Sequence, residues 1–300
     1  MKQQNIHVPT KHKLLLGAHL SISGGLEKAV LAAPALGCTC LQLFTHSNRQ
    51  WDITPLTQQQ IADFAAARKQ TGILALVAHA SYLINIASTQ QQTKALSRRT
   101  LTKELERCEE LQIPFLVLHP GARLTQTVEQ GVAAVVESLD EICEKVPGKS
   151  MILLELMAGQ GSVLGSTLEE LAAMRSGVSH KKRIGFCLDT CHAWAAGYDF
   201  TTPKTYGAFW ERFDEILGIE HLKVIHLNDS KGKLGSHLDR HANIGKGELG
   251  LEAFRLIMND PQLFDIPKIL ETPYESQKDY EKDLEILREL QSTQTKKALS

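Results

Sequence analysis

The sequence lacks several features that would assign it to a well-defined class. Its six cysteines contain no Cys-x-x-Cys pair, and we expect them to be reduced and buried. No apolar run approaches the roughly 18 uncharged residues that a membrane span needs. No Gly-rich nucleotide fingerprint follows any apolar run. The first thirteen residues are polar and do not resemble a secretory leader, so we expect a cytoplasmic protein with no membrane partner.

Net charge is almost absent as well. The chain has 33 Lys and Arg against 34 Asp and Glu, a formal charge of −1. No global basic field therefore indicates a nucleic-acid partner, and any such surface must be local. Apolar residues make up 43% of the 300 residues and charged residues 22%, which is a globular balance and excludes a disordered chain.

Short apolar runs rich in Val, Ile and Leu alternate with stretches of helical periodicity. The runs lie at 14–20, 39–44, 74–79, 115–119, 151–156, 184–189, 222–227 and 266–271. Continuous apolar strands indicate burial on both faces, as in parallel sheets. Eight strand–helix units predict a single-domain (β/α)8 TIM barrel over 14–290, with an N-terminal extension at 1–13 that we expect to be disordered and a tail at 291–300. A doubly wound open sheet is the alternative, and it usually carries a nucleotide fingerprint.

Polar residues of metal-ligand type end most of these runs. In a parallel barrel all such strand ends point to one rim, where active sites are built. Two short motifs in the following loops, DTCH and DRH, add further residues of the same kind. His19 is assigned a supporting role, and His46 is treated as an ordinary loop residue. His237 is an alternative candidate for the site, but Asp239 and His241 of the same segment are favoured. The candidate ligands are His79, His119, Glu155, Asp189, His192, His226, Asp239, His241 and Glu271.

Five histidines and four carboxylates are more than one ion needs. A catalytic zinc uses about three protein ligands, so nine suit up to three ions. Imidazole and carboxylate without thiolate favour Zn²⁺, with Mn²⁺ as a substitute. Three divalent ions against four carboxylates leave a surplus of about +2, which attracts an anion such as a phosphodiester. Paired ions can stabilise both oxygens of an in-line displacement.

These residues and their surroundings resemble the endonuclease IV family of apurinic/apyrimidinic endonucleases. The matching stretches are GAHLSISGG (17–25), NRQW (48–51), HASYLIN (79–85), LHPG (118–121), AGQGS (158–162), FCLDTCHAWAAGYD (186–199), IHLNDSKGKLGSHLDRHANIGKG (225–247) and ETP (271–273). The resemblance implies a TIM barrel with three zinc ions. It further implies a DNA repair enzyme that cuts on the 5′ side of an abasic site, leaves a 3′-hydroxyl and removes blocking groups from 3′ ends.

The resemblance also implies residue roles. His79 and His119 would hold one zinc, and Glu155 would bridge it to a second ion held with Asp189, His226 and Glu271. His192, Asp239 and His241 would hold the third. Glu155 and Glu271 would be the catalytic carboxylates, with Glu271 orienting or deprotonating water. Arg49, Tyr82 and Leu83 match residues that enter the DNA at the lesion.

Four basic residues are predicted to contact double-stranded DNA. Lys231, Lys233, Arg240 and Lys246 follow the seventh run, on the expected rim. We expect a monomer acting on abasic sites or blocked 3′ ends. The chain departs from the family at Leu156 and Met157, where polar residues are usual beside Glu155. Two rivals remain open: an abasic-site-binding protein weakened at that point, and a metal-dependent sugar isomerase on the same fold.

Overall fold

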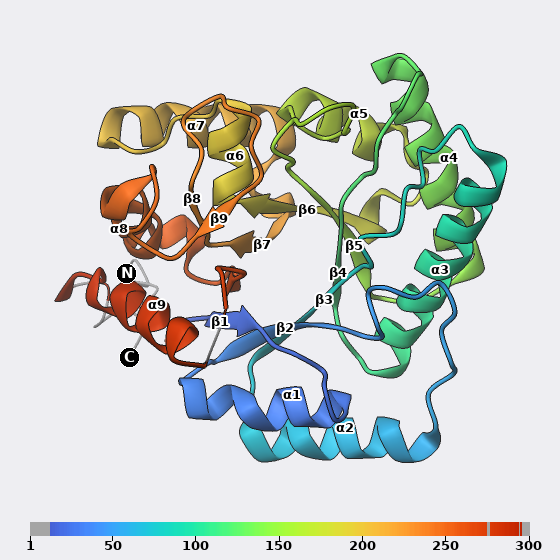
Figure 1. The fold of residues 1–300 in the computed structure, drawn as a ribbon, viewed down its shortest axis with the longest axis horizontal. Coiled ribbons are helices and arrows are strands. Elements are labelled where there is room, and N and C mark those ends of the chain that lie inside the picture. The colour runs from blue at the N-terminus through green and yellow to red at the C-terminus, as the bar shows by residue number, and fades with distance from the viewer. Residues whose placement is uncertain (1–12, 275–276, 294, 296–300) are drawn as a thin grey trace, which may run out of the picture.

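Each predicted apolar run contains one strand of a closed parallel barrel (Figure 1). The computed structural model describes residues 13–274, 277–293 and 295. The barrel strands are β1 (Leu16–His19), β2 (Cys40–Phe44), β3 (Ala75–His79), β4 (Phe115–Leu118), β5 (Met151–Glu155), β6 (Ile184–Asp189), β7 (Leu222–His226) and β10 (Lys268–Leu270). Neighbouring strands are hydrogen-bonded in the order β1-β10-β7-β6-β5-β4-β3-β2, and the sheet closes into a ring.

Helices follow the strands and surround the barrel (Figure 1). They are α1 (Leu26–Ala32), α2 (Gln58–Thr71), α3 (Gln91–Glu110), α4 (Val128–Lys145), α5 (Leu168–Gly177), α6 (Thr190–Ala196), α7 (Pro203–Leu217), α8 (Gly250–Asn259) and α9 (Gln277–Glu289). Short 3-10 segments lie at η1 (Ala33–Leu36), η2 (Lys181–Arg183), η3 (Ile219–His221) and η4 (Pro261–Leu263). The predicted barrel is confirmed, and the open sheet is excluded because β1 pairs with both β2 and β10.

Local sequence signals explain where the helices begin and end. Thr57 and Thr127 open α2 and α4, each accepting a hydrogen bond from the backbone N–H three residues later within a full capping box. Gly72 ends α2 with a φ of 65°, a left-handed conformation that glycine adopts without a Cβ penalty. Leu101 and Leu105, four residues apart in one of the stretches with helical periodicity, are both fully buried on α3.

Gly17 allows β1 to close against its neighbour. A Cβ added at this residue would lie 1.8 Å from the carbonyl oxygen of Cys40 on β2. Carbon and oxygen atoms that are not bonded to each other never approach so closely, so any side chain would force these paired strands apart. The small residue in the GAH sequence is therefore a requirement of barrel closure.

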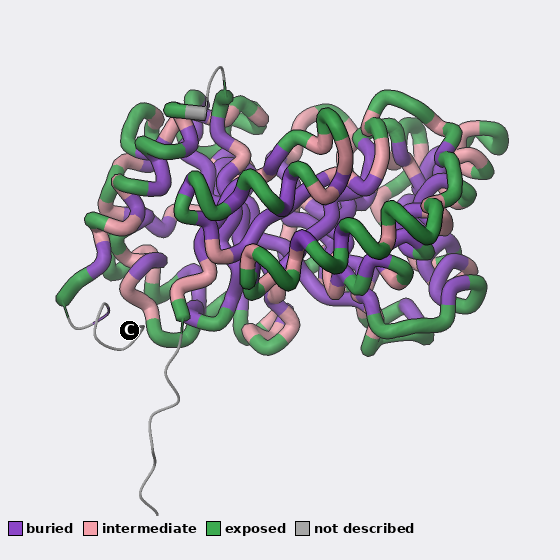
Figure 2. Tube along the Cα trace, turned by 90° about the horizontal axis from the view of Figure 1, so that it is seen from below, coloured by how far each residue is buried: buried purple, intermediate pink, exposed green. Residues whose placement is uncertain are grey.

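The core has two layers, one inside the barrel and one between barrel and helices. The inner layer is a cluster that takes one residue from each of seven strands, namely Cys40, Val77, Val117, Leu153, Cys187, Val224 and Ile269. The larger outer cluster joins the outward-facing strand residues to the buried faces of the helices. Figure 2 shows the same arrangement, with buried chain inside and exposed turns of helix around it.

Two of the connections that follow strands carry additional structure. Helix α6 follows β6 directly, before the longer α7. After β7 the chain forms a small antiparallel hairpin of β8 (Asp229–Ser230) and β9 (His241–Ala242), in which Asp229 pairs with Ala242. The sequence did not predict this hairpin, because two-residue strands show no periodicity.

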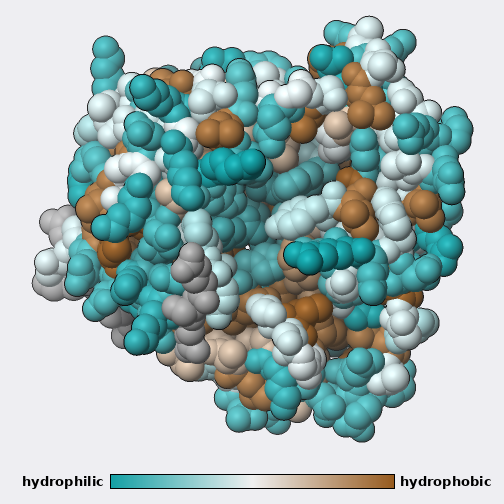
Figure 3. Space-filling view, viewed as in Figure 1, coloured by the Kyte–Doolittle hydropathy of each residue, from teal (hydrophilic) through white to brown (hydrophobic). Residues whose placement is uncertain are grey.

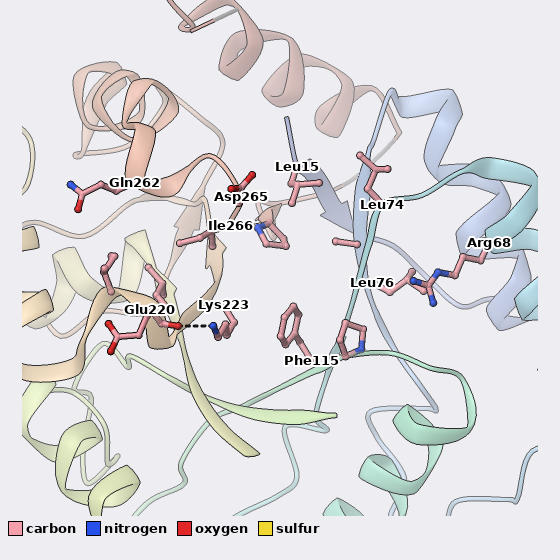
Figure 4. A pocket seen from close by; sticks show the side chains of 15 residues that line it. Leu15, Arg68, Leu74, Leu76, Phe115, Glu220, Lys223, Gln262, Asp265 and Ile266 are labelled. Carbon is pink, nitrogen blue, oxygen red and sulfur yellow. Dashed lines mark hydrogen bonds between the residues drawn. The ribbon is translucent and has the colours of Figure 1, made fainter. Parts of the chain in front are cut away.

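The surface is hydrophilic over most of the face seen in Figure 3, which is hollowed near its middle. At the amino ends of the strands lies a separate cavity of about 570 Å³ (Figure 4). Leu15, Leu74, Phe115 and Ile266 line it, and Lys223 donates a hydrogen bond to the carbonyl of Glu220 at its edge (2.5 Å).

The remaining domain predictions concern the two ends of the chain. The predicted extension at 1–13 lies outside the described residues except for its last residue, and only part of the tail at 291–300 is described. Among the described helices, none combines the length and apolar character needed to cross a membrane.

Candidate metal centre

Strand alternation places the polar rim directly above the inner apolar layer. Side chains two residues apart point to the same face of a strand. Moving two residues along from each of the seven inner-layer residues reaches a polar one, and on β1 the same step leads from Gly17 to His19. The polar layer is therefore Gln42, His79, His119, Glu155, Asp189, His226 and Glu271, with His19 beside them.

Glu155 lies at the centre of this layer and is fully buried. Its Oε2 lies 3.4 Å from His79 Nε2 and 3.1 Å from His119 Nε2. Its Oε1 lies 3.3 Å from His192 Nδ1 and 3.1 Å from His226 Nδ1. One carboxylate thus faces imidazoles from four separate segments, which is the geometry that a bridging ligand requires.

The nine predicted ligands fall into three groups. Within each group, the ligand atoms lie within 4.8 Å of one another. The groups are His79–His119–Glu155, Glu155–Asp189–His226–Glu271 and His192–Asp239–His241. The structure therefore brings all nine together, in the same three sets that the resemblance implied.

Two buried cysteines also border these groups. Cys187 lies with Glu155 and His226, and Cys191 with Asp189 and His241. Burial raises the pKa of each thiol to about 12. The nine predicted ligands themselves offer only imidazole and carboxylate donors.

The imidazoles are oriented through their Nδ1 atoms. His79 Nδ1 lies 2.7 Å from the carbonyl of Ala80, His192 Nδ1 3.1 Å from that of Leu156, and His241 Nδ1 3.0 Å from that of Glu271. The Nε2 atom of each of these histidines is buried and has no hydrogen-bond partner among the described residues. A carbonyl that holds one ring nitrogen and leaves the other for a metal is the usual arrangement around a ligating histidine. The residues present therefore fit metal ions.

Leu156 preserves this arrangement despite being apolar. Its backbone carbonyl orients His192, and a main-chain group does not depend on the side chain that it carries. The side chain of Leu156 packs in the outer core cluster, and Met157 is also buried. The departure from the family beside Glu155 thus leaves the orientation of this ligand intact.

Electrostatics keep the carboxylates ionised. Burial alone would raise the pKa of Glu155, but His226, His119 and hydrogen bonds hold it well below its ordinary value. Burial would likewise raise the pKa of Asp239, but the hydrogen bond with His192 and the nearby imidazoles outweigh it and lower this pKa to about 2. For His226 burial would lower the pKa, but Cys187, Glu271 and Glu155 raise it well above its usual value. Metal cations can replace the protons that these imidazoles hold.

Local structure explains how the loop ligands reach the rim. Asp189 is the N-cap of α6 and accepts a hydrogen bond from the His192 N–H (2.9 Å), which places His192 in the first turn beside the strand end. Asp239 and His241 come from the β8–β9 hairpin, and their Oδ1 and Nε2 atoms lie 3.5 Å apart.

Sequence reasoning missed two supporting amides. Gln42 is fully buried and lies 2.9 Å from His226 Nε2 through its Oε1, while its Nε2 donates to Glu271 Oε1 (2.6 Å). Asn228 donates to Asp189 Oδ2 (2.6 Å) and accepts from the Glu271 N–H (2.8 Å). Glutamine and asparagine are not common metal ligands, so a search for ligand types passed them by. Strand alternation could have identified Gln42, because it lies two residues after the inward-facing Cys40 on the same strand. His19, predicted as a supporting residue, contacts Glu271 Oε1 at 3.2 Å.

Tyr82, Leu83 and Arg49 are exposed on loops beside this layer. The Tyr82 ring lies 5.2 Å from that of His79 and 5.5 Å from that of His119, measured between centroids. Leu83 follows it in the same loop. The structure therefore brings the Tyr82 ring next to two of the candidate ligands.

A buried carboxyl group connects the two loops that carry Arg49 and Tyr82. Glu104 on α3 contacts His46 Nε2 at 2.6 Å and accepts a hydrogen bond from the Ser81 N–H at 3.0 Å. The Ser81 hydroxyl in turn donates to the Asn48 carbonyl (2.9 Å). The interpretation of His46 as an ordinary loop residue is wrong, because this histidine is largely buried against Glu104.

One face of α3 holds the rest of the Arg49 loop. Thr100 and Arg107 donate to the carbonyls of Trp51 (3.2 Å) and Thr54 (2.7 Å). Lys103 donates to the carbonyl of Ile53 at 3.4 Å. These side chains are spaced three and four residues apart, so they share one side of the helix.

The predicted basic DNA contacts lie on or beside the small hairpin. Lys231, Lys233, Arg240 and Lys246 are all exposed. The Lys231 N–H donates to the Arg240 carbonyl across the hairpin (2.9 Å), so these residues lie opposite each other. His237, the alternative candidate in this segment, places Nδ1 3.0 Å from the Ala158 carbonyl and belongs to none of the three ligand groups.

Comparisons with known proteins found relatives of this chain. A family described as xylose isomerase-like TIM barrel matches residues 30–290. "Probable endonuclease 4" of Chloroflexus aggregans is 44% identical over 258 residues, covering 86% of this chain and 90% of that protein. "Apurinic-apyrimidinic endonuclease" of Caenorhabditis elegans is 40% identical over 262 residues, covering 86% of this chain and 66% of that protein. Endonuclease IV from Thermus thermophilus aligns with a TM-score of 0.81 at 35% identity, over 92% of this chain and 98% of that structure. A D-tagatose 3-epimerase-like protein, 21% identical with a TM-score of 0.69 and covering 91% of this chain and 96% of that one, shows only the shared fold.

Proposed function

Because this chain belongs to the endonuclease IV family, we propose that it is a DNA repair endonuclease that hydrolyses the phosphodiester 5′ to an abasic site and leaves a 3′-hydroxyl. The observation that supports this proposal most strongly is the convergence of nine ligand-type side chains into three groups on one rim. The exposed Tyr82 and Leu83 beside them supply side chains that can enter a duplex.

We propose three zinc ions as the cofactors, with manganese as a substitute. His79, His119 and Glu155 would hold the first, Glu155, Asp189, His226 and Glu271 the second, and His192, Asp239 and His241 the third. When bound, such ions act as Lewis acids and lower the pKa of water towards 7. The mixed imidazole and carboxylate donors suit zinc.

Two carboxylates of the chain would hold the ions of this site together. Glu155 holds the first two groups together because both of its oxygens are shared between imidazoles. Burial would raise the pKa of Glu271, but His226, His19 and His79 depress it. We assign Glu271 as a ligand that orients or deprotonates water.

Binding of the substrate would depend on the loops and the hairpin. Tyr82 and Leu83 would enter the stack at the lesion, and Arg49 would fill the space vacated by the flipped sugar. Lys231, Lys233, Arg240 and Lys246 would contact phosphates of double-stranded DNA, each adding about 0.9 to the salt dependence of binding. We propose that the monomer is active and that the same site removes blocking groups from 3′ ends.

The experiment is nicking of a duplex with one abasic site by zinc-loaded protein, with an undamaged duplex as the control. We expect a cut on the 5′ side of the lesion that a strong chelator abolishes, and release of blocked 3′ ends by the same preparation. A protein that shifts the duplex without cutting it would identify the weakened binder instead. Turnover of a sugar with no effect on DNA would identify the isomerase, for which the group His192–Asp239–His241 would be surplus.

A further inference from the structure

A second pocket opens on the same rim, beside the candidate ligands. Its volume is about 350 Å³, and it lies between the loop after β1, the loop after β2 and the segment that follows β10. Phe44, Tyr274 and Tyr280 supply aromatic walls, and Ser47 and Asn48 supply polar groups. No role assigned above to the metal groups uses this pocket.

Tyr274 is the unusual feature of the pocket. Its side chain is 53% exposed, and among the described residues the only exposed aromatic side chains are Tyr274 and Tyr82. Leaving a large aromatic ring in water forgoes its burial energy. Both exposed rings lie on the rim that faces the proposed substrate, so both are placed where a flat, apolar ligand can cover them.

The Tyr274 ring is held in place. It stacks on Tyr280 of α9 with centroids 4.8 Å apart and an angle of 27° between ring planes, and Tyr280 itself is buried in the core. Asp283 of α9 fixes the preceding segment, because its Oδ2 accepts from the Thr272 hydroxyl (2.6 Å) and from Asn243 (2.9 Å). The platform is therefore built into the fold at its base while its outer face stays open.

The position of the pocket relates it to the damaged strand. His19 borders it and contacts Glu271 Oε1 at 3.2 Å. Tyr274 follows Glu271 by three residues, so their Cα atoms lie at most about 11 Å apart. Phe44 forms a wall shared with Tyr82, at 5.4 Å between ring centroids. A strand whose scissile phosphate lies at the metal groups would pass next to this pocket.

We propose that Tyr274, backed by Tyr280, stacks on a nucleobase adjoining the abasic site on the damaged strand. The abasic sugar has no base that could stack on an aromatic ring. The bases on either side of it have lost a stacking partner, so moving one of them out of the duplex costs less free energy. Stacking of a base on an aromatic side chain contributes about 1–3 kcal/mol. This inference rests on the proposed function and adds a base-contacting subsite to it.

The test uses an abasic duplex with 2-aminopurine, a fluorescent base, on the 5′ side of the lesion, on its 3′ side or opposite it. Fluorescence is recorded on rapid mixing with the zinc-loaded full-length protein, before nicking, and kcat and KM are measured on the same duplexes. We expect wild type to quench one of the two flanking probes. Tyr274→Ala should abolish that quenching and raise KM about 5- to 150-fold.

Tyr274→Phe keeps the ring and should keep the quenching. Leu74→Ala is the matched control, because it truncates another exposed apolar side chain, at the cavity on the opposite end of the barrel (Figure 4). Equal quenching and KM in wild type and Tyr274→Ala would overturn the inference while nicking by both upheld the function. Quenching lost only at the base opposite the lesion would overturn the assignment to the damaged strand. A wild-type protein that neither binds nor cuts the duplex would overturn both proposals together.

Discussion

Neutralising Glu155 should remove the metal ions without unfolding the protein. Glu155→Gln keeps the size of the side chain and eliminates its charge. Four imidazole nitrogens lie 3.1–3.4 Å from its oxygens, and no solvent reaches it. Loss of a side chain that merely supports a metal ligand costs about 10–100-fold in metal affinity, so loss of this ligand's charge should cost at least as much.

The chain offers a matched control for this substitution. Glu104 is also a buried carboxylate paired with a histidine, at 2.6 Å from His46, but it lies outside the three ligand groups. Glu104→Gln should keep its zinc and weaken nicking through KM, because it loosens the loops that carry Arg49 and Tyr82.

The assay measures zinc content by mass spectrometry after dialysis against limiting zinc, together with nicking of an abasic duplex. We expect Glu155→Gln to lose both zinc and nicking. Full metal content and wild-type nicking in Glu155→Gln would refute the bridging role. Equal zinc loss in Glu104→Gln would show that the effect comes from any buried charge and not from ligation.

Three further perturbations test the fold and the site. Gly17→Ala should lower the free energy of unfolding in urea by at least about 3 kcal/mol, because its Cβ would meet the Cys40 carbonyl. Gly207→Ala, with open space around it on α7, should leave the free energy of unfolding almost unchanged or raise it. Equal effects of the two substitutions would contradict the packing argument. Burial lowers the pKa of Lys268 from 10.5 to about 8. Between pH 8 and pH 10.5 this lysine is therefore protonated in the unfolded chain but neutral in the folded protein, so the free energy of unfolding rises with pH across this range. Relative to Lys268→Met, wild type should gain about 3 kcal/mol between pH 8 and pH 10.5, and a constant difference would disprove the shift. Chelation should lower the melting temperature measured by calorimetry, since ions held at a hundred times their Kd contribute about 2.7 kcal/mol each; an unchanged melting temperature would argue against bound ions.

Much of the barrel could be predicted because its signals are local. Each apolar run showed the continuous hydrophobic pattern of a strand buried on both faces. Several of the stretches between the runs showed helical periodicity, and Gly72 marks the end of α2. The candidate ligands stood out because their residue types are rare at the ends of apolar strands. Two-residue strands such as β8 gave no such signal, and the hairpin that carries Asp239 and His241 appeared only in the structure.

Supporting contacts could not be predicted in the same way, because they join residues distant in the chain. Glu104 lies 58 residues from His46, and Gln42 lies 184 residues from His226. Nothing in the local sequence of either pair marks its partner. Their meeting depends on the order of strands around the ring and on the face of α3 that turns inwards.

The sequence alone thus determined the strands, the alternation of their side chains and the chemistry of the residues at their ends. Only the tertiary structure decided which of those residues meet. The physical reason is closure: pairing of β1 with both β2 and β10 brings strand ends from the whole chain onto one rim, where Glu155 can face four imidazoles at once. A pattern with a period of two residues fixes which side chains point inwards, but it contains no information about their neighbours across the barrel.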